Sequence, residues 1–461
     1  MSIIQTNLED WIEPRYKEYS LYTCMKRAIP HLIDGLKPSQ RKILYTAIRR
    51  AKSMVKVASL GGYVLAEANY KHGDSVTGTI SLMGQDFVGS NNFPLLDKKG
   101  GFGNRFGASP SAPRYIYVKL SDFFDQLFLK LDEEILLPSD DLEDPDPSFY
   151  VPIIPYVLLN GINGIAVGFS VNIPSYNPLD IIKNIEYILK GSSKRLELRP
   201  YYRGYNGEIL KIDGQWTMYG KFNKINTTTI EVTEIPMGIT RESYKEHLNK
   251  LIDKDIIKDY DDMSDKNWRF IIRAHREFVV QSDDKIMSEL NLVQKIFEKI
   301  NVIFDNKILE YENPIQLIED FVKIRLGFYE LRQKNMLTGY QKDILKFFIK
   351  YSVNMYIKTK GEKKFDKEEA ISYIEKKKPT IIEYYKDMVS GYDENKISDI
   401  FDENFKGIMD TLRLNELYSD KIKEYQDKIE TLTLIHNTLF EKKREDLYQE
   451  DLKNLKKAFS K

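Results

Sequence analysis

An arginine and a tyrosine stand side by side as Arg114 and Tyr115 in the stretch SAPRYIYVKL. A tyrosine hydroxyl that attacks a phosphodiester exchanges one phosphate ester for another, so the bond energy is kept for resealing. A free phenol has a pKa near 10, and only about a thousandth of it is ionised at neutral pH. An adjacent guanidinium favours the phenolate and neutralises charge on the five-coordinate phosphorus. The pair is therefore a candidate nucleophile and its cation, with an ordinary packed tyrosine as the alternative.

The stretch RYIYVKL is strand-like, and consecutive residues of a strand point to opposite faces. We therefore expect Arg114 to face away from Tyr115 unless the strand bends. Tyr117 would share the face of Tyr115 and is expected only to pack. Other cations of the same section would then have to complete the site, and the candidates are Arg27, Arg41 and His72.

The net charge is zero, with 69 Lys+Arg and 69 Asp+Glu, but the charge is unevenly distributed along the chain. Residues 21–120 hold 15 Lys+Arg and 5 Asp+Glu, a surplus of +10. Residues 121–150 hold one Lys and ten acids, a deficit of −9. Because salt screens charge beyond about 10 Å, a local basic surface is enough to attract phosphate. The distribution is compatible with a nucleic-acid partner, and a solvated basic face is the alternative.

The composition argues against several other classes of protein. No apolar run approaches the roughly 20 residues that a membrane-spanning helix needs, and the acidic N-terminus does not resemble a secretion signal. With one cysteine and five histidines, neither a disulfide nor a zinc site is expected. No GxxxxGK[ST] loop is present, so ATP is not expected to bind by that route. The acidic stretch SDDLEDPDPS is expected to be an exposed turn rather than a metal site.

Three sections must position these groups, and together they predict a mixed α+β fold. The first, residues 1–135, contains a helix over Pro38–Lys52 with proline at its start and a second helix over Asp74–Gln85. The strand RYIYVKL follows, and this order predicts a winged-helix domain. The second section, residues 136–310, is expected to be a strand-rich tower domain. It alternates apolar and polar residues along Gly207–Pro236, as in a β-meander, and then returns to helical spacing.

The last section, residues 311–461, is helical. Its apolar residues follow heptad spacing in two stretches, which are Leu317, Phe321, Ile324, Phe328 and Leu331, and later Tyr418, Ile422, Tyr425, Ile429, Leu432 and Leu439, with His436 filling the gap. Two such stretches about 90 residues apart predict a long antiparallel coiled coil that carries a small terminal dimerisation gate. A pair of amphipathic helices in a bundle is the alternative.

Several motifs resemble those of type IIA DNA topoisomerases, in the family's order and over essentially the whole chain. DGLKPSQRKILYTAIRR is similar to the family's DGxKPxxRR/K signature. YKHGDSVTGTISLMGQDFVGSNNFPLLDKKGGFGNRFGASPSAPRYIY resembles its HG(D/E)…GxFGxR…RY block. NGINGIAVGFSVNIPSYNP, YYRGYNG and TEIP resemble further segments. The segments FVGSNN and PRYIY resemble those of eukaryotic-type enzymes more closely than those of bacterial gyrase.

The resemblance implies roles for five residues of a catalytic site. Tyr115 takes the position of the nucleophile, and Arg114 is the arginine directly before it. Arg27 in KRAIP, Arg41 in DGLKPSQR and His72 in KHGD match cations that surround the scissile phosphate in the family.

Five further residues match positions that are expected to contact DNA. Lys37 and Lys42 belong to the DGxKPxxRR/K match, and Lys71 stands where relatives carry histidine or proline. Ser75 falls in the recognition helix, although that segment is one residue shorter than in relatives. Ile165 in NGIAVG matches an isoleucine that inserts between base pairs, and an apolar wedge of this kind trades unstacking energy for a bent duplex. Because GIAVGF is apolar throughout, a core position is the alternative for Ile165.

The resemblance implies the cleaving and rejoining subunit of a type II topoisomerase, which is a homodimer that acts on double-stranded DNA. The family's Toprim, ATPase and wrapping domains have no counterpart in this sequence. We therefore expect Mg²⁺ and ATP to be bound by a partner subunit, as in gyrase or the split enzymes of large tailed phages, in the cytoplasm of a bacterium or a phage-infected cell. An excised core of a single-chain enzyme is the alternative organisation. A non-enzymatic architectural DNA-binding protein and a coiled-coil scaffold are the alternative functions.

Overall fold

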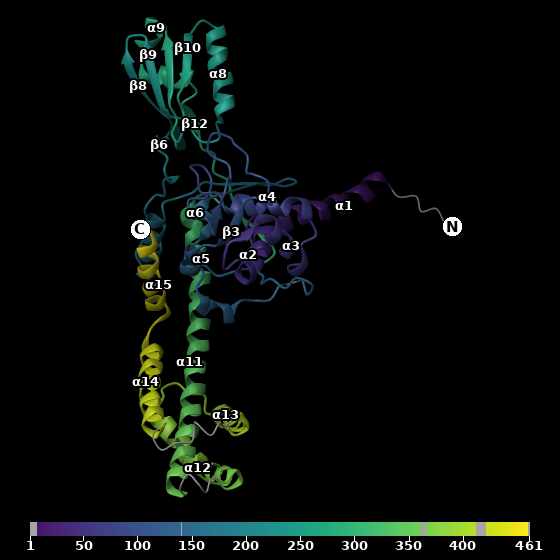
Figure 1. Cartoon of the computed structure of the whole chain (residues 1–461), viewed down its shortest axis with the longest axis vertical. Helices are drawn as coiled ribbons and strands as arrows, with labels where there is room; N and C mark the ends of the chain where they lie inside the picture. The colour runs from purple at the N-terminus through teal and green to yellow at the C-terminus, as the bar shows by residue number, and fades with distance from the viewer. Residues whose placement is uncertain (1–6, 140, 361–365, 412–420, 460–461) are drawn as a thin grey trace, which may run out of the picture. The chain divides into compact units, whose positions relative to one another are not determined.

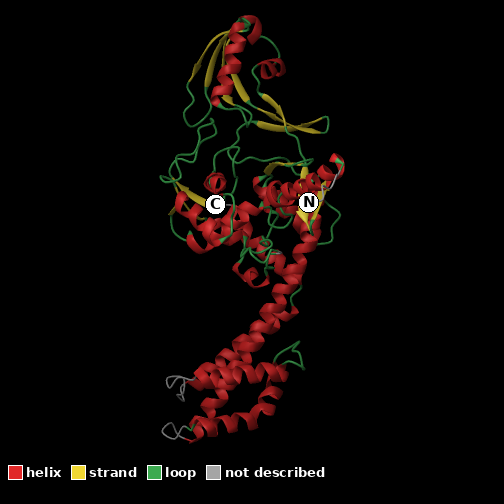
Figure 2. Cartoon of the chain, turned by 90° about the vertical axis from the view of Figure 1, so that its right-hand side faces the viewer, coloured by secondary structure: helices red, strands yellow, loops and turns green. Residues whose placement is uncertain are grey.

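The computed structural model describes residues 7–139, 141–360, 366–411 and 421–459. The chain forms two compact units, of which the first comprises Met1–Arg325 and Asp451–Lys461 and the second Leu326–Glu450. Helices and strands are both abundant, as expected for a mixed α and β fold (Figures 1 and 2). Within the described part of the chain, no helix is both long and apolar enough to cross a membrane.

The N-terminal part of the first unit packs helices on a small antiparallel sheet of strand order β1–β3–β2. Its elements are α1 (Leu8–Thr23), the π-helical turn η1 (Cys24–Ala28), α2 (Pro38–Arg50), β1 (Val55–Lys56), α3 (Val57–Glu67), α4 (Gly73–Met83), β2 (Leu96–Lys99) and β3 (Tyr117–Leu120). The predicted helix start at Pro38 is confirmed, because proline needs no hydrogen-bond partner in the first turn. The second predicted helix is α4, which begins one residue earlier than expected.

One apolar cluster fills this part and fixes the direction of its strands. It includes Ile43, Val57, Leu60, Val64, Ile80, Phe102, Ile116 and Val118. Ile116 and Val118 are both fully buried, and side chains alternate along a strand. Tyr117, which stands between them in the sequence, therefore points away from the core, and Tyr115 in the turn before β3 is exposed.

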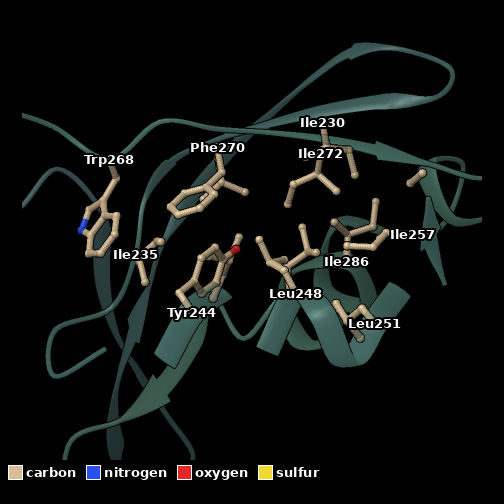
Figure 3. Close-up of a cluster of buried hydrophobic side chains, with 14 of the residues drawn as sticks. Ile230, Ile235, Tyr244, Leu248, Leu251, Ile257, Trp268, Phe270, Ile272 and Ile286 are labelled. Atoms are coloured by element: carbon tan, nitrogen blue, oxygen red, sulfur yellow. The ribbon is translucent and has the colours of Figure 1, made fainter. Parts of the chain in front are cut away.

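The strand-rich part of the same unit has a core of its own. It contains β6 (Glu208–Ile212), β7 (Gln215–Tyr219), β8 (Lys221–Asn226), β9 (Thr229–Glu234), α8 (Arg241–Asp253), β10 (Ile257–Asp262), β11 (Phe270–Ala274), α9 (Arg276–Val279), α10 (Asp283–Glu289) and β12 (Val293–Lys295). Figure 3 shows Tyr244 and Leu248 of α8 packing against Phe270 and Ile272 of the sheet.

The predicted β-meander is split between two sheets. Strands β6 and β7 join β12, whereas β8 and β9 join β10 and β11. The chain changes sheet at Gly220, whose amide donates to Leu292 O at 2.7 Å. A Cβ atom there would stand 2.5 Å from Glu234 O and 3.0 Å from Leu292 Cδ2. The hairpins were predictable, but this crossing depends on tertiary packing around a glycine.

Shorter elements complete the first unit. They are α5 (Asp122–Leu127), η2 (Lys130–Ile135), α6 (Tyr156–Asn160), the hairpin of β4 (Ile162–Ile165) and β5 (Ser170–Ile173), α7 (Pro178–Leu189) and the hairpin of β13 (Ile300–Phe304) and β14 (Lys307–Tyr311).

The second unit is helical and pairs two helical arms in opposite directions. The helices that contribute to it are α11 (Pro314–Lys360), α12 (Lys367–Met388), α13 (Ile397–Thr411), α14 (Lys421–Glu441) and α15 (Arg444–Phe459). Contacts between the arms include Phe347–Tyr425, Gln341–His436, Gln333–Leu439 and Tyr329–Tyr448. Numbers fall along one arm as they rise along the other, so the arms are antiparallel.

The predicted apolar stripes of these arms are partly correct. Tyr425, Ile429, His436 and Leu439 are buried as expected. In the first stripe Leu317, Phe321 and Phe328 are also buried as expected. Its last position departs from the prediction, because Leu331 is exposed and Arg332 beside it is buried. Tyr418 lies outside the described residues.

We predict that Gly220→Ala lowers the free energy of unfolding of the strand-rich part by about 1–3 kcal/mol, because the new methyl group overpacks the crossing between sheets. Gly62→Ala is the matched control, since Gly62 lies on α3 with no atom within 4 Å of an added Cβ. Thermal melts followed by circular dichroism compare the two. Equal midpoints for both variants would contradict the role of Gly220.

Candidate active site

Tyr115 lies in a tight turn that directly precedes β3. Its amide donates to Ala112 O at 2.9 Å. On either side of the turn, Val57 N donates to Ile116 O at 3.0 Å and Ala58 N to Pro113 O at 3.1 Å. Tyr115 is 66% exposed although the backbone of this turn is held at three points. Burial raises the pKa of the half-buried Tyr202 to about 12.

Arg114 lies over the ring of Tyr115 rather than facing away from it. The guanidinium carbon Cζ is 4.9 Å from the ring centroid, which is within the range of a cation–π contact. The expectation of opposite directions was wrong because these residues occupy a turn, where the alternation of a strand does not hold. Both side chains are exposed, so one phosphate can meet the hydroxyl and the guanidinium together.

A glycine-rich loop holds the turn from behind. Ser111 N donates to Gly101 O at 2.9 Å. Gly100 has φ +106°, and a Cβ atom there would lie 2.9 Å from the side chain of Ile116. The glycines of KKGGFGNRFG therefore allow the backbone to approach the turn closely.

Arg27 and His72 form a second exposed group. Arg27 Nη2 lies 2.8 Å from His72 Nε2, and because a guanidinium only donates, Nε2 is the acceptor of this hydrogen bond. The Tyr22 hydroxyl is 3.5 Å from the same Nε2, and Arg27 Cζ is 5.5 Å from the Tyr22 ring. Among the described residues, no hydrogen bond joins this group to the Tyr115 hydroxyl. One chain thus presents two exposed sites that could meet phosphate.

Arg41, which was expected among the cations around the phosphate, is buried. Its Nε donates to Asp34 Oδ2 at 2.7 Å and its Nη2 to Asp34 Oδ1 at 3.1 Å. Asp34 is fully buried and also accepts from Leu36 N and Tyr150 N. Burial opposes the charged guanidinium, but Asp34 outweighs it and raises the pKa of Arg41. The structure makes Arg41 part of a buried ion pair that shapes the turn before α2.

Lys42, which was expected to contact DNA, is likewise buried. Its Nζ lies 2.7 Å from Asp144 Oδ1, 2.9 Å from Asp146 Oδ1 and 2.9 Å from Ala68 O. Asp146 is buried with it, and burial raises the pKa of this carboxyl against the opposing effect of Lys42. The acidic stretch SDDLEDPDPS is therefore only partly an exposed turn, because its Asp144 and Asp146 neutralise the charge of Lys42 on α2.

Three further residues that were expected to contact DNA, Lys37, Lys71 and Ser75, differ in exposure. Lys37 is half-buried and donates to Asn163 O at 2.6 Å, and burial lowers its pKa. Lys71 is exposed, with Nζ 3.9 Å from Glu143 Oε2. Ser75 is exposed in the first turn of α4, where its hydroxyl donates to His72 O at 3.1 Å.

Ile165 is 90% exposed, which excludes the core alternative. It ends β4 and pairs with Ser170, and Ala166 N donates to Phe169 O at 2.8 Å to close the hairpin. A Cβ atom on Gly164 would collide with Ala28 O, so this hairpin lies directly on the turn that carries Arg27.

Sequence reasoning missed two residues of this region. Asp34 stands seven residues before Arg41, and an acid inside an otherwise apolar segment was the available signal for a buried partner. Tyr22 gave no signal. Within the described ranges, no group of three or more His, Cys, Asp or Glu side chains could hold a metal ion.

The sequence matches, over residues 27–453, the model of the family described as the A-type subunit of DNA gyrase/topoisomerase IV. It is 36% identical over 381 residues to the mitochondrial DNA topoisomerase 2 of Dictyostelium discoideum, covering 79% of this chain and 30% of that protein. It is 33% identical over 358 residues to DNA topoisomerase 2 of Invertebrate iridescent virus 6, covering 74% and 31%. The chain thus spans about a third of the length of these relatives.

A solved structure is also similar. The DNA-binding, cleavage and re-ligation domain of Plasmodium falciparum topoisomerase II matches with a TM-score of 0.81 and 27% identity, covering 97% of this chain and 63% of that one. The family match extends over most of the sequence. The chain belongs to the family of DNA gyrase/topoisomerase IV A-type subunits.

Proposed function

We propose that the chain is the DNA-cleaving and rejoining part of a type IIA topoisomerase. The observation that carries the proposal is the exposed phenol of Tyr115, held in a turn beneath the guanidinium of Arg114. Family membership and the similar DNA-cleaving domain support the same reaction.

In the proposed reaction the Tyr115 oxygen attacks a backbone phosphorus of duplex DNA. The phenol loses its proton, a phosphotyrosine bond to the 5′ end forms, and the bond from phosphorus to the 3′ oxygen breaks. The 3′ oxygen leaves with a proton as a hydroxyl group. Arg114 stabilises the negative charge of the five-coordinate phosphorus, and rejoining is the reverse of these steps. Arg27 and His72 are proposed to bind the DNA phosphates beside this centre.

Mg²⁺ would stabilise the attacking and leaving oxygens in such a displacement. The described residues contain no carboxylate cluster that fits such an ion, so we assign none to them. We propose that Mg²⁺ and ATP are bound by a partner subunit that carries the Toprim and ATPase domains, in the cytoplasm of a bacterium or a phage-infected cell. The relatives are longer proteins. The alternative is therefore that the Toprim and ATPase domains belong to the same polypeptide as this chain.

The architecture suits strand passage by a dimer. We assign residues 1–135 to a winged-helix domain, 136–310 to a tower domain and 311–461 to a coiled coil with a dimerisation gate. A two-fold homodimer places one Tyr115 on each strand, which a double-strand break requires. A second duplex then passes through the break.

Ile165 is proposed to bend the cleaved duplex. It is apolar, exposed and carried on a hairpin that Lys37 and Gly164 hold against the basic part. Smooth bending of a duplex costs of order 1–6 kcal/mol, so flexible base steps should be preferred without direct base contacts.

An architectural DNA-binding protein is the second candidate function. The exposed Ile165 and the basic side chains of the N-terminal part are compatible with it. It gives no reason for a held, exposed tyrosine beneath an arginine, so we favour the enzyme. A coiled-coil scaffold accounts for neither feature.

We predict that Tyr115→Phe abolishes covalent attachment to DNA, because phenylalanine has no oxygen to attack phosphorus. The chain and its partner are incubated with supercoiled DNA, Mg²⁺ and ATP, and detergent traps any adduct. Tyr117→Phe is the control and should retain the adduct, since Tyr117 is half-buried in β3. Adduct formation by Tyr115→Phe would refute the assignment.

Ile165→Ala should reduce DNA bending and leave non-specific affinity within about twofold, because the wedge contributes little to phosphate contacts. Energy transfer between dyes on the two ends of a short duplex measures the bend. Ile225→Ala removes the same atoms from another exposed isoleucine on β8 and should bend DNA normally. Equal bending by both variants would exclude the wedge.

The two lysines that the sequence treated alike should differ in DNA binding. Lys71→Met should reduce the slope of log affinity against log salt by about 1, because one exposed phosphate contact is lost. Lys42→Met should keep that slope and instead lower the melting temperature, since it leaves Asp144 and Asp146 without their cation. Salt titrations on folded protein test this, and an unchanged slope for Lys71→Met would remove that residue from the DNA contact.

A further inference from the structure

The segment from Lys99 to Ser111 joins two hydrophobic cores, and the proposed chemistry leaves this unexplained. Phe102 near its start is buried in the N-terminal cluster, where Gln85 Nε2 donates to Phe102 O at 2.9 Å. Ser111 at its end returns to Gly101, three residues before Arg114. The loop therefore begins and ends in the part that carries the catalytic turn.

The tip of this loop lies in the core of the strand-rich part. Phe106 is buried with its ring centroid 4.6 Å from that of Trp268, in an edge-to-face arrangement. Arg241 N donates to Phe106 O at 2.9 Å at the start of α8. Trp268 belongs to the cluster drawn in Figure 3, so the tip contributes to that core.

Beside Phe106, a buried ion pair fastens the tip to the end of β9. Both terminal nitrogens of Arg105 contact the carboxylate of Glu234, Nη2 at Oε1 and Nη1 at Oε2. The side chains are 9% and 1% exposed. Asn206 N and Ile235 N, each at 3.1 Å, also donate to Glu234. The carboxylate is thus well satisfied only while Arg105 stays in place.

The loop itself is short and internally bonded. Asn104 Oδ1 accepts from Phe106 N at 3.0 Å and from Ala108 N at 3.3 Å. Gly103 has φ +83°, and a Cβ atom there would lie 2.5 Å from Ala108 O. Because these bonds make the loop rigid, we expect a displacement of its tip to move Gly101 and, through Gly101, the turn that carries Tyr115.

We propose that Arg105 and Glu234 are positioning residues for the nucleophile: they fix the strand-rich part to the loop that holds the Tyr115 turn, so that the phenol reaches phosphorus only while this pair is intact. The proposal rests on the function proposed above. It gives a role to the GxFGxR and TEIP motifs, neither of which touches the reacting atoms.

The test compares Arg105→Gln with Arg269→Gln. Arg269 Nε donates to Glu231 Oε1 at 2.9 Å on the same sheet, but Arg269 is exposed and this ion pair does not include a residue of the loop. With saturating DNA and the partner subunit, Arg105→Gln should form the covalent adduct at least about 10-fold more slowly, while its DNA Kd stays within about twofold. Arg269→Gln should match the wild type, and Arg105→Lys, which keeps the charge, should recover most of the rate.

Native-state hydrogen exchange gives a readout that does not depend on catalysis. The amides of residues 115–118 should exchange faster in Arg105→Gln than in Arg269→Gln. If Arg105→Gln does not fold, Phe106→Leu keeps an apolar tip without the ring and should show both effects in weaker form.

The proposal would be overturned if Arg105→Gln formed the adduct at the wild-type rate at saturating DNA. It would also be overturned if weaker DNA binding fully explained a slower rate, or if amide exchange at the turn were unchanged. Failure of the wild type to form any adduct would instead count against the proposed function, and the exchange experiment would still decide whether the loop transmits motion.

Discussion

The backbone turn from Ala112 to Tyr115 is the constraint on which the candidate site depends. A nucleophile has to be exposed to its substrate and yet held in one place, and an exposed side chain has few contacts to hold it. Here the restraint lies in the main chain, through the bond from Tyr115 N to Ala112 O and the burial of Ile116. The turn also brings Arg114 over the phenol ring, which a straight strand would prevent.

Charge is divided between two tasks in this part of the chain. Arg41 forms an ion pair with Asp34, and Lys42 forms ion pairs with Asp144 and Asp146. These pairs hold α2 to the segments around it. Arg27 and Arg114 remain exposed and are free to meet phosphate. Because exposed cations attract DNA whereas buried pairs are already neutralised, a count of basic residues overstates the surface that a nucleic acid meets.

The sequence revealed the elements better than their contacts. The start of α2 at Pro38 and the amphipathic α8 follow from local rules that act within one helix, and both were predicted. Which face of α2 would be buried depends on acids more than 100 residues away, so the fate of Lys42 was beyond any local pattern. The place of Ile165 was also left open by the sequence, because an apolar residue suits both a core and a wedge. The sheet change at Gly220 also had no local signal beyond the glycine itself.

The most direct test of the central claim is to identify the residue that becomes attached to DNA. The trapped adduct is digested with nuclease and protease, and mass spectrometry locates the nucleotide on the peptide. We expect it on the oxygen of Tyr115, joined to a 5′-phosphate. A nucleotide on Tyr117 or on any other residue, or attachment through a 3′-phosphate, would contradict the mechanism.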